Sequence, residues 1–450
     1  MWPRVAGPRR LLGTTFIVLI VWTVVLWIFL PYDNPVLLLF RFVIQKTFSF
    51  LRVPFDDERW LYELPEFPVD LSKDVALVIK TGYGTQERVP ALFDALEMLY
   101  QKEDDHNILV VGDFSTQYQS NGQKLVVHDV VAAVMEDDRL RGVRHMDRFD
   151  KYRNMTAAIK KGHKKQAKDI AKKVGWELDA LKFIPGLELA YRTFPGKKWY
   201  IIQDDDTYMV KPSLELILGH FDPLKPFYLG NVVGDFKGRF AHGGSGIILS
   251  QMAMSQLFDA NPDVVYDALV NSLTETWGDK LVATTFLKIG IYLEERYSHF
   301  FNGERPSITK MRASRFCSPI VSFHGLADPS QMRQVGDMFQ EIDQPVFWSQ
   351  LWEIYDQPDL SIFERNPMRL GHDHVGRLDE ETMTTRNVNS VDKCLAICNR
   401  HFNTCLAWTW DRETHECHIS PWVIIGEKAK TKFSGMNVQR MKKMMRECGS

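Results

Sequence analysis

Three carboxylates stand side by side in the middle of the chain, at Asp204, Asp205 and Asp206. They directly follow the apolar run KWYIIQ (198–203), which predicts a buried strand. Adjacent carboxylates repel one another and are costly to bury, so a positive charge should lie between them. Oxygen ligands of this kind suit Mg²⁺ or Mn²⁺, which complete their coordination with water and a substrate diphosphate. The alternative is an acidic surface turn that caps the helix predicted from about Pro212.

Two strand ends earlier in the chain are candidates for a nucleotide pocket. The run VALVIK (75–80) predicts a buried strand that leads into Thr81 and Gly82, and residues 108–111 predict a second strand that ends close to Asp113. Ligands of parallel α/β sheets bind at the carboxyl ends of the strands. We therefore expect Thr81, Gly82 and Asp113 to contact a nucleotide, with plain strand-to-helix turns as the alternative.

These candidate residues need a layered scaffold to position them. From Asp74 to about residue 355, short apolar runs alternate with helical patterns, which predicts an α/β domain with a largely parallel sheet over 74–355. Lysines spaced four apart between Lys160 and Lys172 mark one face of an amphipathic helix. That face is predicted to be solvated, and attraction of an anionic substrate or a membrane surface is the alternative. The polar segment 356–386 is predicted to be a linker.

Five motifs in order and spacing carry a family resemblance. They are KWYIIQDDDTYMV (198–210), FYLGNV (227–232), FAHGGSGIILS (240–250), WGDKLVATTFLKIGI (277–291) and CSPIVSFHG (317–325). Together they resemble the fringe-like enzymes of glycosyltransferase family 31. The similarity looks closest to a fungal branch of that family, extends to the core 1 β1,3-galactosyltransferases and covers roughly residues 75–330.

The resemblance implies a GT-A fold, Rossmann-like in its nucleotide-binding half, that uses a UDP-sugar donor and Mn²⁺ or Mg²⁺. The carboxylate triplet matches the family's DxD motif: Asp206 would ligate the metal, with Asp204 beside it, and Asp204 and Asp205 would face the ribose and diphosphate. His324 matches the histidine that completes the metal site. Gly243 and Gly244 match the glycine-rich segment beneath the donor sugar, where a side chain would collide with substrate. Without the resemblance, the glycine-rich segment would be interpreted as a simple turn. His324 would be interpreted as an ordinary core or loop histidine.

Asp279 matches the family's catalytic base. An inverting transfer needs a carboxylate that takes the proton of the acceptor hydroxyl as the oxygen attacks the anomeric carbon. The sequence departs from the family pattern at Gly278, where the family usually has Glu, so the acceptor contacts of Trp277 and Gly278 are expected to differ. The alternative is that Asp279 caps the helix from Lys280 onward.

Five of the six cysteines gather near the end of the chain, within the segment 387–450. The spacing Cys394-x₃-Cys398-x₆-Cys405, followed by an aromatic run and Cys417, resembles a PAN or apple-type module that binds protein or carbohydrate. Four cysteines allow three pairings, and the resemblance favours Cys394 with Cys417 and Cys398 with Cys405. Zinc binding with His415 or His418 is the alternative. Cys317 and Cys448 either pair with each other or stay single.

An uncharged apolar run from Leu11 to Leu30 is about 20 residues long, enough to span a bilayer as a helix. Arginines precede it and acidic residues follow, so the positive-inside rule predicts a type II signal anchor with a cytosolic tail (1–10) and a lumenal body. A cleaved signal peptide is the alternative. Residues 31–73 are predicted to be a stem, and the apolar patch 36–44 within it has an interfacial helix as its alternative.

The predicted compartment is the Golgi or the endoplasmic reticulum, where disulfides persist. There the Asn154-Met155-Thr156 sequon makes Asn154 a candidate for glycosylation. The 450 residues carry 55 basic and 57 acidic side chains, a net charge of -2, which argues against nucleic-acid binding.

The leading hypothesis is a membrane-anchored UDP-sugar-dependent hexosyltransferase that transfers a hexose or N-acetylhexosamine to a glycan or glycoprotein. As the resemblance implies, it would act with inversion and form a β1,3 linkage. One alternative is a catalytically silent glycan-binding or scaffold protein that retains the fold. Another is a metal-dependent phosphoester hydrolase built on the triplet alone.

Overall fold

The computed structural model describes residue 22 and residues 29–51, 56–96, 107–120 and 123–448. Within these residues no helix is both long enough and apolar enough to cross a membrane. The anchor predicted over 11–30 lies outside them, except for Trp22, Phe29 and Leu30.

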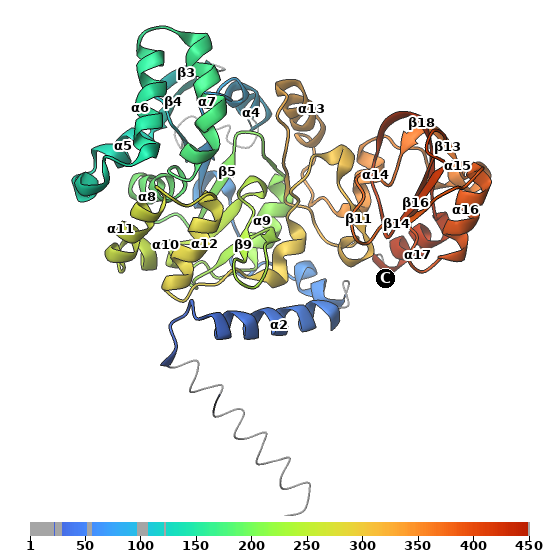
Figure 1. Cartoon of the computed structure of the whole chain (residues 1–450). Coiled ribbons are helices and arrows are strands. Elements are labelled where there is room, and N and C mark those ends of the chain that lie inside the picture. The colour runs from blue at the N-terminus through green and yellow to red at the C-terminus, as the bar shows by residue number, and fades with distance from the viewer. Residues whose placement is uncertain (1–21, 23–28, 52–55, 97–106, 121–122, 449–450) are drawn as a thin grey trace, which may run out of the picture.

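A seven-stranded mixed sheet forms the centre of the larger region, in the order β3-β4-β2-β1-β5-β10-β7 (Figure 1). Its strands are β1 (Val75–Lys80), β2 (Ile108–Gly112), β3 (Thr116–Ser120), β4 (Gln123–Asp129), β5 (Trp199–Asp204), β7 (Tyr228–Gly230) and β10 (Ile247–Ser250). The four neighbours β4, β2, β1 and β5 are parallel, while β3, β10 and β7 pair antiparallel. The predicted α/β class is confirmed, with antiparallel strands added at both edges.

Both faces of the sheet are buried, which explains why its central strands are continuously apolar. Alternate residues of β1 enter opposite cores: Leu77 and Ile79 lie in one hydrophobic cluster, and Ala76 and Val78 lie in the other. Helices cover the two faces. The first face carries α4 (Arg88–Leu96), α9 (Lys211–Gly219) and α13 (Pro329–Phe339), and the second carries α7 (Lys164–Asp179), α8 (Phe183–Thr193), α10 (Gln251–Phe258) and α12 (Gly278–Lys288).

The predicted basic amphipathic helix corresponds to α7, whose Ala167, Ala171 and Leu178 are buried, but Lys160 ends the preceding helix and so does not share its face. The predicted glycosylation site lies one helix earlier, on α6 (Asp147–Lys160), where Asn154 is exposed. Its modification stays a prediction.

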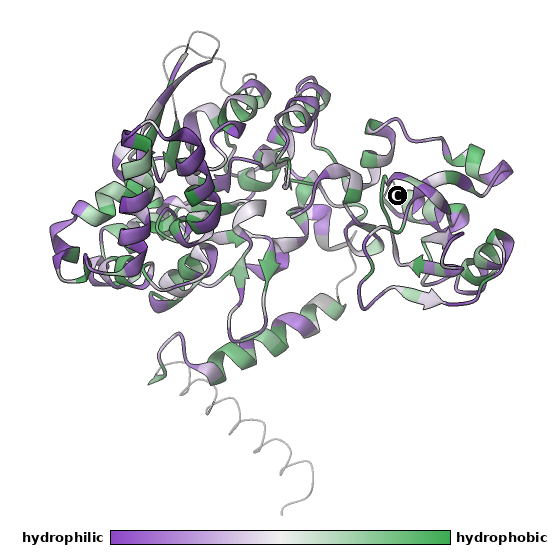
Figure 2. Ribbon diagram, turned by 45° about the horizontal axis from the view of Figure 1, so that its top comes forward, coloured by the Kyte–Doolittle hydropathy of each residue, from purple (hydrophilic) through white to green (hydrophobic). Residues whose placement is uncertain are grey.

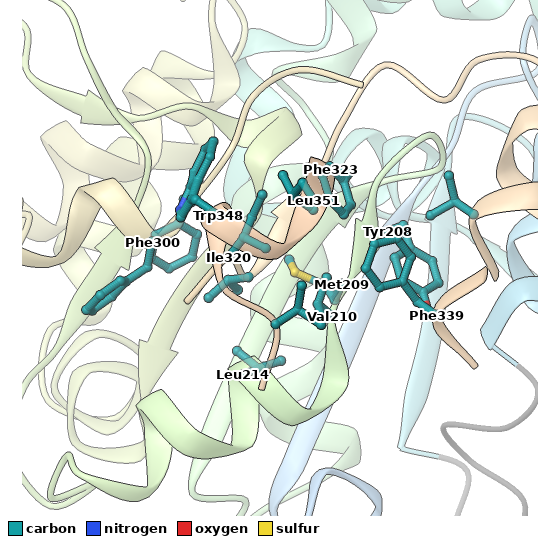
Figure 3. Close-up of a cluster of buried hydrophobic side chains, with 14 of the residues drawn as sticks. Tyr208, Met209, Val210, Leu214, Phe300, Ile320, Phe323, Phe339, Trp348 and Leu351 are labelled. Atoms are coloured by element: carbon teal, nitrogen blue, oxygen red, sulfur yellow. The ribbon is translucent and has the colours of Figure 1, made fainter. Parts of the chain in front are cut away.

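A short two-stranded ribbon joins the middle of the chain to a later segment. Here β6 (Tyr208–Met209) pairs antiparallel with β12 (Ser322–Phe323). The ribbon is held in a dense apolar cluster, in which Phe323 contacts Phe339 with ring centroids 5.4 Å apart (Figure 3). This packing fixes the segment after β12 beside the end of β5.

The predicted stem is folded against the domain in its described parts. Helix α2 (Pro35–Leu51) runs along the lower side of the domain in Figure 1. The following 3-10 helix η1 (Asp56–Tyr62) contributes the buried Leu61 to the core, and Glu58 accepts a hydrogen bond from Ser318 Oγ at 2.8 Å. These residues are therefore part of the domain's packing.

The C-terminal region contains its own five-stranded antiparallel sheet, in the order β13-β18-β15-β16-β14. Its strands are β13 (Arg369–Asp373), β14 (Met383–Thr385), β15 (Ala407–Asp411), β16 (Glu416–Ser420) and β18 (Glu427–Met436). Strands β13 and β14 fall within 356–386, so the linker predicted there is wrong. Both lie at the edges of the sheet, where polar residues are tolerated. Their sequences therefore lack the apolar pattern that predicts a strand.

Disulfides fix this region and tie it to the larger domain. Cys394 and Cys398 on α16 (Val391–Arg400) pair with Cys417 and Cys405, so both predicted bridges are confirmed. The alternative of a zinc site is wrong, because its thiolates are consumed in the bridges. Cys317 pairs with Cys448 at the end of α17 (Val438–Cys448), which settles a pairing that the sequence left open. In addition, β11 (Met311–Arg312) pairs with β17 (Trp422–Val423) across the two regions.

Candidate metal and nucleotide-sugar site

The fold brings His324 to the carboxylate triplet. Asp204 ends β5, the chain turns through Asp205 and Asp206 into β6, and β6 pairs with β12, which His324 follows directly. The backbone N–H of Leu326 also donates to the carbonyl of Asp206 at 3.0 Å. Residues more than a hundred positions apart in the sequence therefore share one edge of the sheet.

Asp204, Asp206 and His324 form a group that could hold a metal ion. Their candidate ligand atoms all lie within 4.8 Å of one another. His324 Nε2 is 3.3 Å from Asp206 Oδ1 and 3.9 Å from Asp204 Oδ2, while Nδ1 is 3.3 Å from the carbonyl of Gly303. A proton on Nδ1 bound to that carbonyl leaves Nε2 as the ligand atom, an arrangement usual for metal-binding histidines. Two carboxylates and an imidazole fit Mn²⁺ or Mg²⁺.

The pKa of His324 reflects this surrounding. Burial alone would lower its pKa, but the hydrogen bond and charge of Asp206, together with Asp204, outweigh burial and raise it. Without a cation, the two carboxylates therefore attract a proton onto His324, which is the behaviour of a site with excess negative charge.

Asp205 is held by different partners. Its Oδ2 accepts hydrogen bonds from Thr81 Oγ1 at 2.7 Å and from Thr85 Oγ1 at 2.8 Å, and its Oδ1 lies 3.2 Å from Arg88 Nη1. Burial and the charge of Asp206 raise its pKa to about 6. Asp205 thus connects the triplet to the loop after β1 by hydrogen bonds, and the predicted nucleotide residue Thr81 is one of the two donors.

The other predicted nucleotide residues lie in the same loop region. Asp113 accepts a hydrogen bond from the backbone N–H of Tyr83 at 2.8 Å, and its Oδ2 is 2.9 Å from Lys182 Nζ. A Cβ added to Gly82 would lie 3.3 Å from the same Oδ2. Gly82 and Asp113 are therefore neighbours, as expected of loops at adjacent strand ends.

Three basic residues of the site were missed in the sequence. Lys80 is buried at the end of β1, with its Nζ 2.6 Å from Asp204 Oδ1 and 2.9 Å from Asp179 Oδ2. Burial opposes its charge, but the two carboxylates outweigh burial and raise its pKa. The signal was a lysine closing an otherwise apolar strand. Lys182 and Arg88 carried no comparable signal, because their partners are set by tertiary packing.

Arg88 begins α4 and lies between two members of the triplet, with Nη1 3.1 Å from Asp206 Oδ2. The site as a whole holds more carboxylates than basic side chains in contact with them. The carboxylates are Asp113, Asp179, Asp204, Asp205 and Asp206, and the basic partners are Lys80, Lys182 and Arg88. This excess of negative charge, most of it partly or fully buried, favours an added cation.

The glycine-rich segment packs directly on the candidate metal site. A Cβ on Gly244 would lie 2.3 Å from His324 Nε2, so a larger residue would displace the histidine. Thr207 Oγ1 donates to the carbonyl of Gly244 at 2.7 Å. His242, which the sequence did not single out, places its ring centroid 5.2 Å from that of His324. The packing against His324 therefore already requires glycine at position 244. Space for a donor sugar would be a second reason.

Asp279 lies beside the same segment, in the first turn of α12. Its Oδ2 accepts a hydrogen bond from the backbone N–H of Gly243 at 2.9 Å, and its Oδ1 accepts one from the backbone N–H of Lys280 at 2.8 Å. Burial raises its pKa, which the two backbone hydrogen bonds only partly offset. The bond to Lys280 is a local helix-start contact, while the bond to Gly243 links Asp279 to the metal site.

The neighbours of Asp279 explain the departure from the family pattern. A Cβ on Gly278 would lie 2.2 Å from the ring of Phe183 and 2.8 Å from the Cα of Ala180, so glutamate does not fit this backbone. Gly278 is buried and presents no surface to an acceptor. Trp277 is 45% exposed, and its ring lies 6.0 Å from that of Phe240, so it offers an aromatic surface next to the site.

Comparison with protein-family models gives two matches. The model described as Fringe-like matches residues 160–357, and the PAN domain model matches residues 372–439. The first range contains the triplet, the glycine-rich segment, Asp279 and His324, and it begins after the loops that hold Thr81 and Asp113. The mixed α/β sheet fits a GT-A-like domain, and the disulfide-linked sheet fits a PAN module. The chain therefore contains a fringe-like region, of the glycosyltransferase family 31 kind, followed by a C-terminal PAN domain.

Proposed function

We propose that the chain is an inverting glycosyltransferase that moves a hexose or N-acetylhexosamine from a UDP-sugar to a hydroxyl of a glycan or glycoprotein, forming a β1,3 linkage. The observation that carries this proposal is the group of Asp204, Asp206 and His324 beside a partly buried carboxylate, Asp279, to which it is joined through Gly243 and Gly244. A metal site and a base on neighbouring segments are what such a transfer requires.

Asp204, Asp206 and His324 would hold Mn²⁺ or Mg²⁺, which when bound neutralises charge on the leaving diphosphate. Asp279 takes the proton of the acceptor hydroxyl while that oxygen forms a bond to the anomeric carbon. The bond from that carbon to the diphosphate oxygen breaks on the opposite face, and UDP leaves with its electron pair. Asp279 accepts hydrogen bonds from two backbone N–H groups. These bonds hold the carboxylate in a fixed orientation for this step.

Thr81, Gly82 and Asp113 are proposed to contact the nucleotide, since they lie in the loops at the carboxyl ends of β1 and β2. Trp277 is proposed to stack on an acceptor sugar. The disulfides and the apolar run 11–30 support a single-pass type II protein of the Golgi or endoplasmic reticulum, with these domains in the lumen. The PAN domain is proposed to bind a protein or carbohydrate.

The test is release of UDP from a panel of UDP-sugars in the presence of Mn²⁺. We expect one donor to be turned over by the native chain, and Asp206→Ala to abolish that turnover. Asp169→Ala, which alters an exposed carboxylate on α7, is the matched control and should behave as the native chain. Binding of a glycan without turnover of any donor would instead support the catalytically silent alternative and overturn the proposal.

A further inference from the structure

Helix α2 packs on the domain with an unusual choice of side chains. The stripe that faces the domain is formed by Leu37, Leu38, Arg41, Phe42 and Gln45. The Arg41 guanidinium lies 3.6 Å from the centre of the Tyr292 ring, and the Phe42 ring lies 6.2 Å from that of Phe236. The inner stripe thus holds Arg41, one of the two charged residues of α2, and the other is Lys46.

The outward face of α2 is mostly apolar and is exposed in the structure. Its exposed residues include Val36 at 58%, Leu39 at 45%, Phe40 at 42%, Val43 at 53%, Phe50 at 87% and Leu51 at 66%. The hydroxyl of Thr47 on this face donates to the carbonyl of Val43 at 2.9 Å, so it has a partner within the helix. Figure 2 shows α2 as a largely hydrophobic helix along the underside of the domain. A helix on a water-facing surface normally presents polar side chains on its outward face.

The sequence beside α2 indicates what covers this face. The uncharged apolar run from Leu11 ends at Leu30, and α2 begins at Pro35. A chain that leaves a bilayer at Leu30 has too little length before Pro35 to carry α2 away from the lipid surface. A helix with a broad apolar face then lies in the plane of the interface, where Lys46 can extend its ammonium toward headgroups.

Side chains of the domain contact both α2 and the turn that precedes it. Tyr292 Oη donates to the carbonyl of Tyr32 at 3.1 Å, while the same ring carries the Arg41 guanidinium. Arg239 lies 5.1 Å from the centre of the Phe42 ring and is paired with Glu295. These contacts hold α2 against the domain, so a helix lying on the bilayer would set the orientation of the whole domain.

We propose that α2 lies in the interfacial layer of a lipid bilayer, with its outward face among the acyl chains and its inner stripe docked on the domain. The small cavity between α2 and the domain, about 70 Å³, is lined by Leu38, Phe42 and Lys280. Lys280 adjoins Asp279, so the start of α12 lies on the membrane side of the domain. The proposal concerns the membrane contact and does not depend on the proposed transfer reaction.

The experiment uses the full chain in nanodiscs of phosphatidylcholine and phosphatidylserine. Every cysteine is in a disulfide, so Val43→Cys provides a single thiol for a fluorescent label. Val36→Cys gives a second position on the same face, should the first variant fold poorly. Trp176→Cys is the control, because Trp176 is 69% exposed on α7, on the far side of the domain.

We expect brominated lipid to quench most of the emission at positions 43 and 36, and iodide in the water to quench little. The label at position 176 should behave in the opposite way. Iodide quenching at position 43 equal to that at 176 would overturn the proposal, because the face would then lie in water. Protection from iodide without quenching by brominated lipid would also overturn it, since a second copy of the chain or another protein would then cover α2.

Discussion

Buried carboxylates have different surroundings in the two folded regions. In the PAN domain, Asp373 Oδ1 accepts from the N–H of Gly376 at 2.9 Å and from Thr409 Oγ1 at 2.8 Å, while Oδ2 is 2.7 Å from Lys432. Burial alone would raise its pKa, but these partners lower it. In the fringe-like region, burial raises the pKa of Asp205 to about 6 and also raises that of Asp279.

The difference separates a structural carboxylate from carboxylates that can do chemistry. All three carboxylates have donors for both oxygens, but only the partners of Asp373 outweigh burial and lower the pKa. The carboxylates of the fringe-like region outnumber their basic partners, which leaves them able to accept a cation or a proton.

Asp279→Asn keeps the shape of the side chain and removes its basicity. We expect kcat to fall by about 10²–10⁴-fold with little change in KM for the donor, because general base catalysis typically contributes that much. Steady-state kinetics with the accepted UDP-sugar measure both constants. Asp263→Asn, at an exposed site on α11 (Pro262–Asn271), is the control. An unchanged kcat would show that Asp279 only supports the start of α12.

The pH dependence of kcat gives an independent check on the same carboxylate. Asp279 must be ionised to accept a proton, and burial raises its pKa above the ordinary value. The rate should therefore fall as the pH drops through this raised pKa, and it should do so at a higher pH than an ordinary aspartate would give. The residual rate of Asp279→Asn should lack this acidic limb. Persistence of the limb in the variant would assign it to another group.

The disulfides differ in the length of chain that they close. Cys317–Cys448 spans 131 residues, whereas Cys398–Cys405 spans 7. Chain-entropy arguments predict a loss of about 5 kcal/mol of unfolding free energy when the long bridge is replaced by serines, and about 2 kcal/mol for the short one. Chemical denaturation of the two double variants measures the difference. Equal losses would mean that the PAN domain unfolds independently of the fringe-like region.

Lys80 and Lys432 offer a matched comparison of the two regions. Lys80→Met should cost about 1.5–3 kcal/mol of unfolding free energy, because it removes a buried ammonium that the partly exposed carboxylates of Asp204 and Asp179 share. Lys432→Met should cost only about 1 kcal/mol, because Asp373 keeps its other donors. Addition of Mn²⁺ should restore part of the loss in Lys80→Met alone. Similar costs without any effect of Mn²⁺ would remove the proposed contrast.

Gly244→Ala tests the packing of the glycine-rich segment on His324. The added Cβ would lie 2.3 Å from Nε2, so the imidazole must move, and we expect Mn²⁺ affinity to fall about 10–100-fold. Gly142→Ala is the control, because a Cβ there meets nothing within 4 Å. Isothermal titration with Mn²⁺ and UDP measures the affinity. Native affinity in Gly244→Ala would mean that His324 does not ligate the metal.

The elements of the site could be predicted where local sequence determines them. The apolar runs of β1 and β5 and the triplet that ends β5 are continuous in sequence, and the structure bears them out. The part played by His324 depended on a family resemblance, because its neighbour Asp206 lies far away in sequence. Lys182 and Arg88 were missed for a related reason, since their partners are chosen by packing between distant elements.

The same physics explains the error over the predicted linker. Strand β13 is polar and contains Gly371 in a left-handed conformation, with φ of 77°. Such a segment has no apolar periodicity, and only its backbone pairing with β18 makes it a strand. Patterns of hydrophobicity report buried faces, so they miss elements that are held by backbone hydrogen bonds at a sheet edge.

We propose that Asp204, Asp206 and His324 share one divalent cation. The most direct measurement is Mn²⁺ binding in the presence of UDP, followed by the electron paramagnetic resonance signal of free Mn²⁺. We expect one bound ion in the native chain, loss of that binding in Asp206→Ala and in His324→Ala, and native binding in Asp169→Ala. Undiminished binding in both of the first two variants would contradict it.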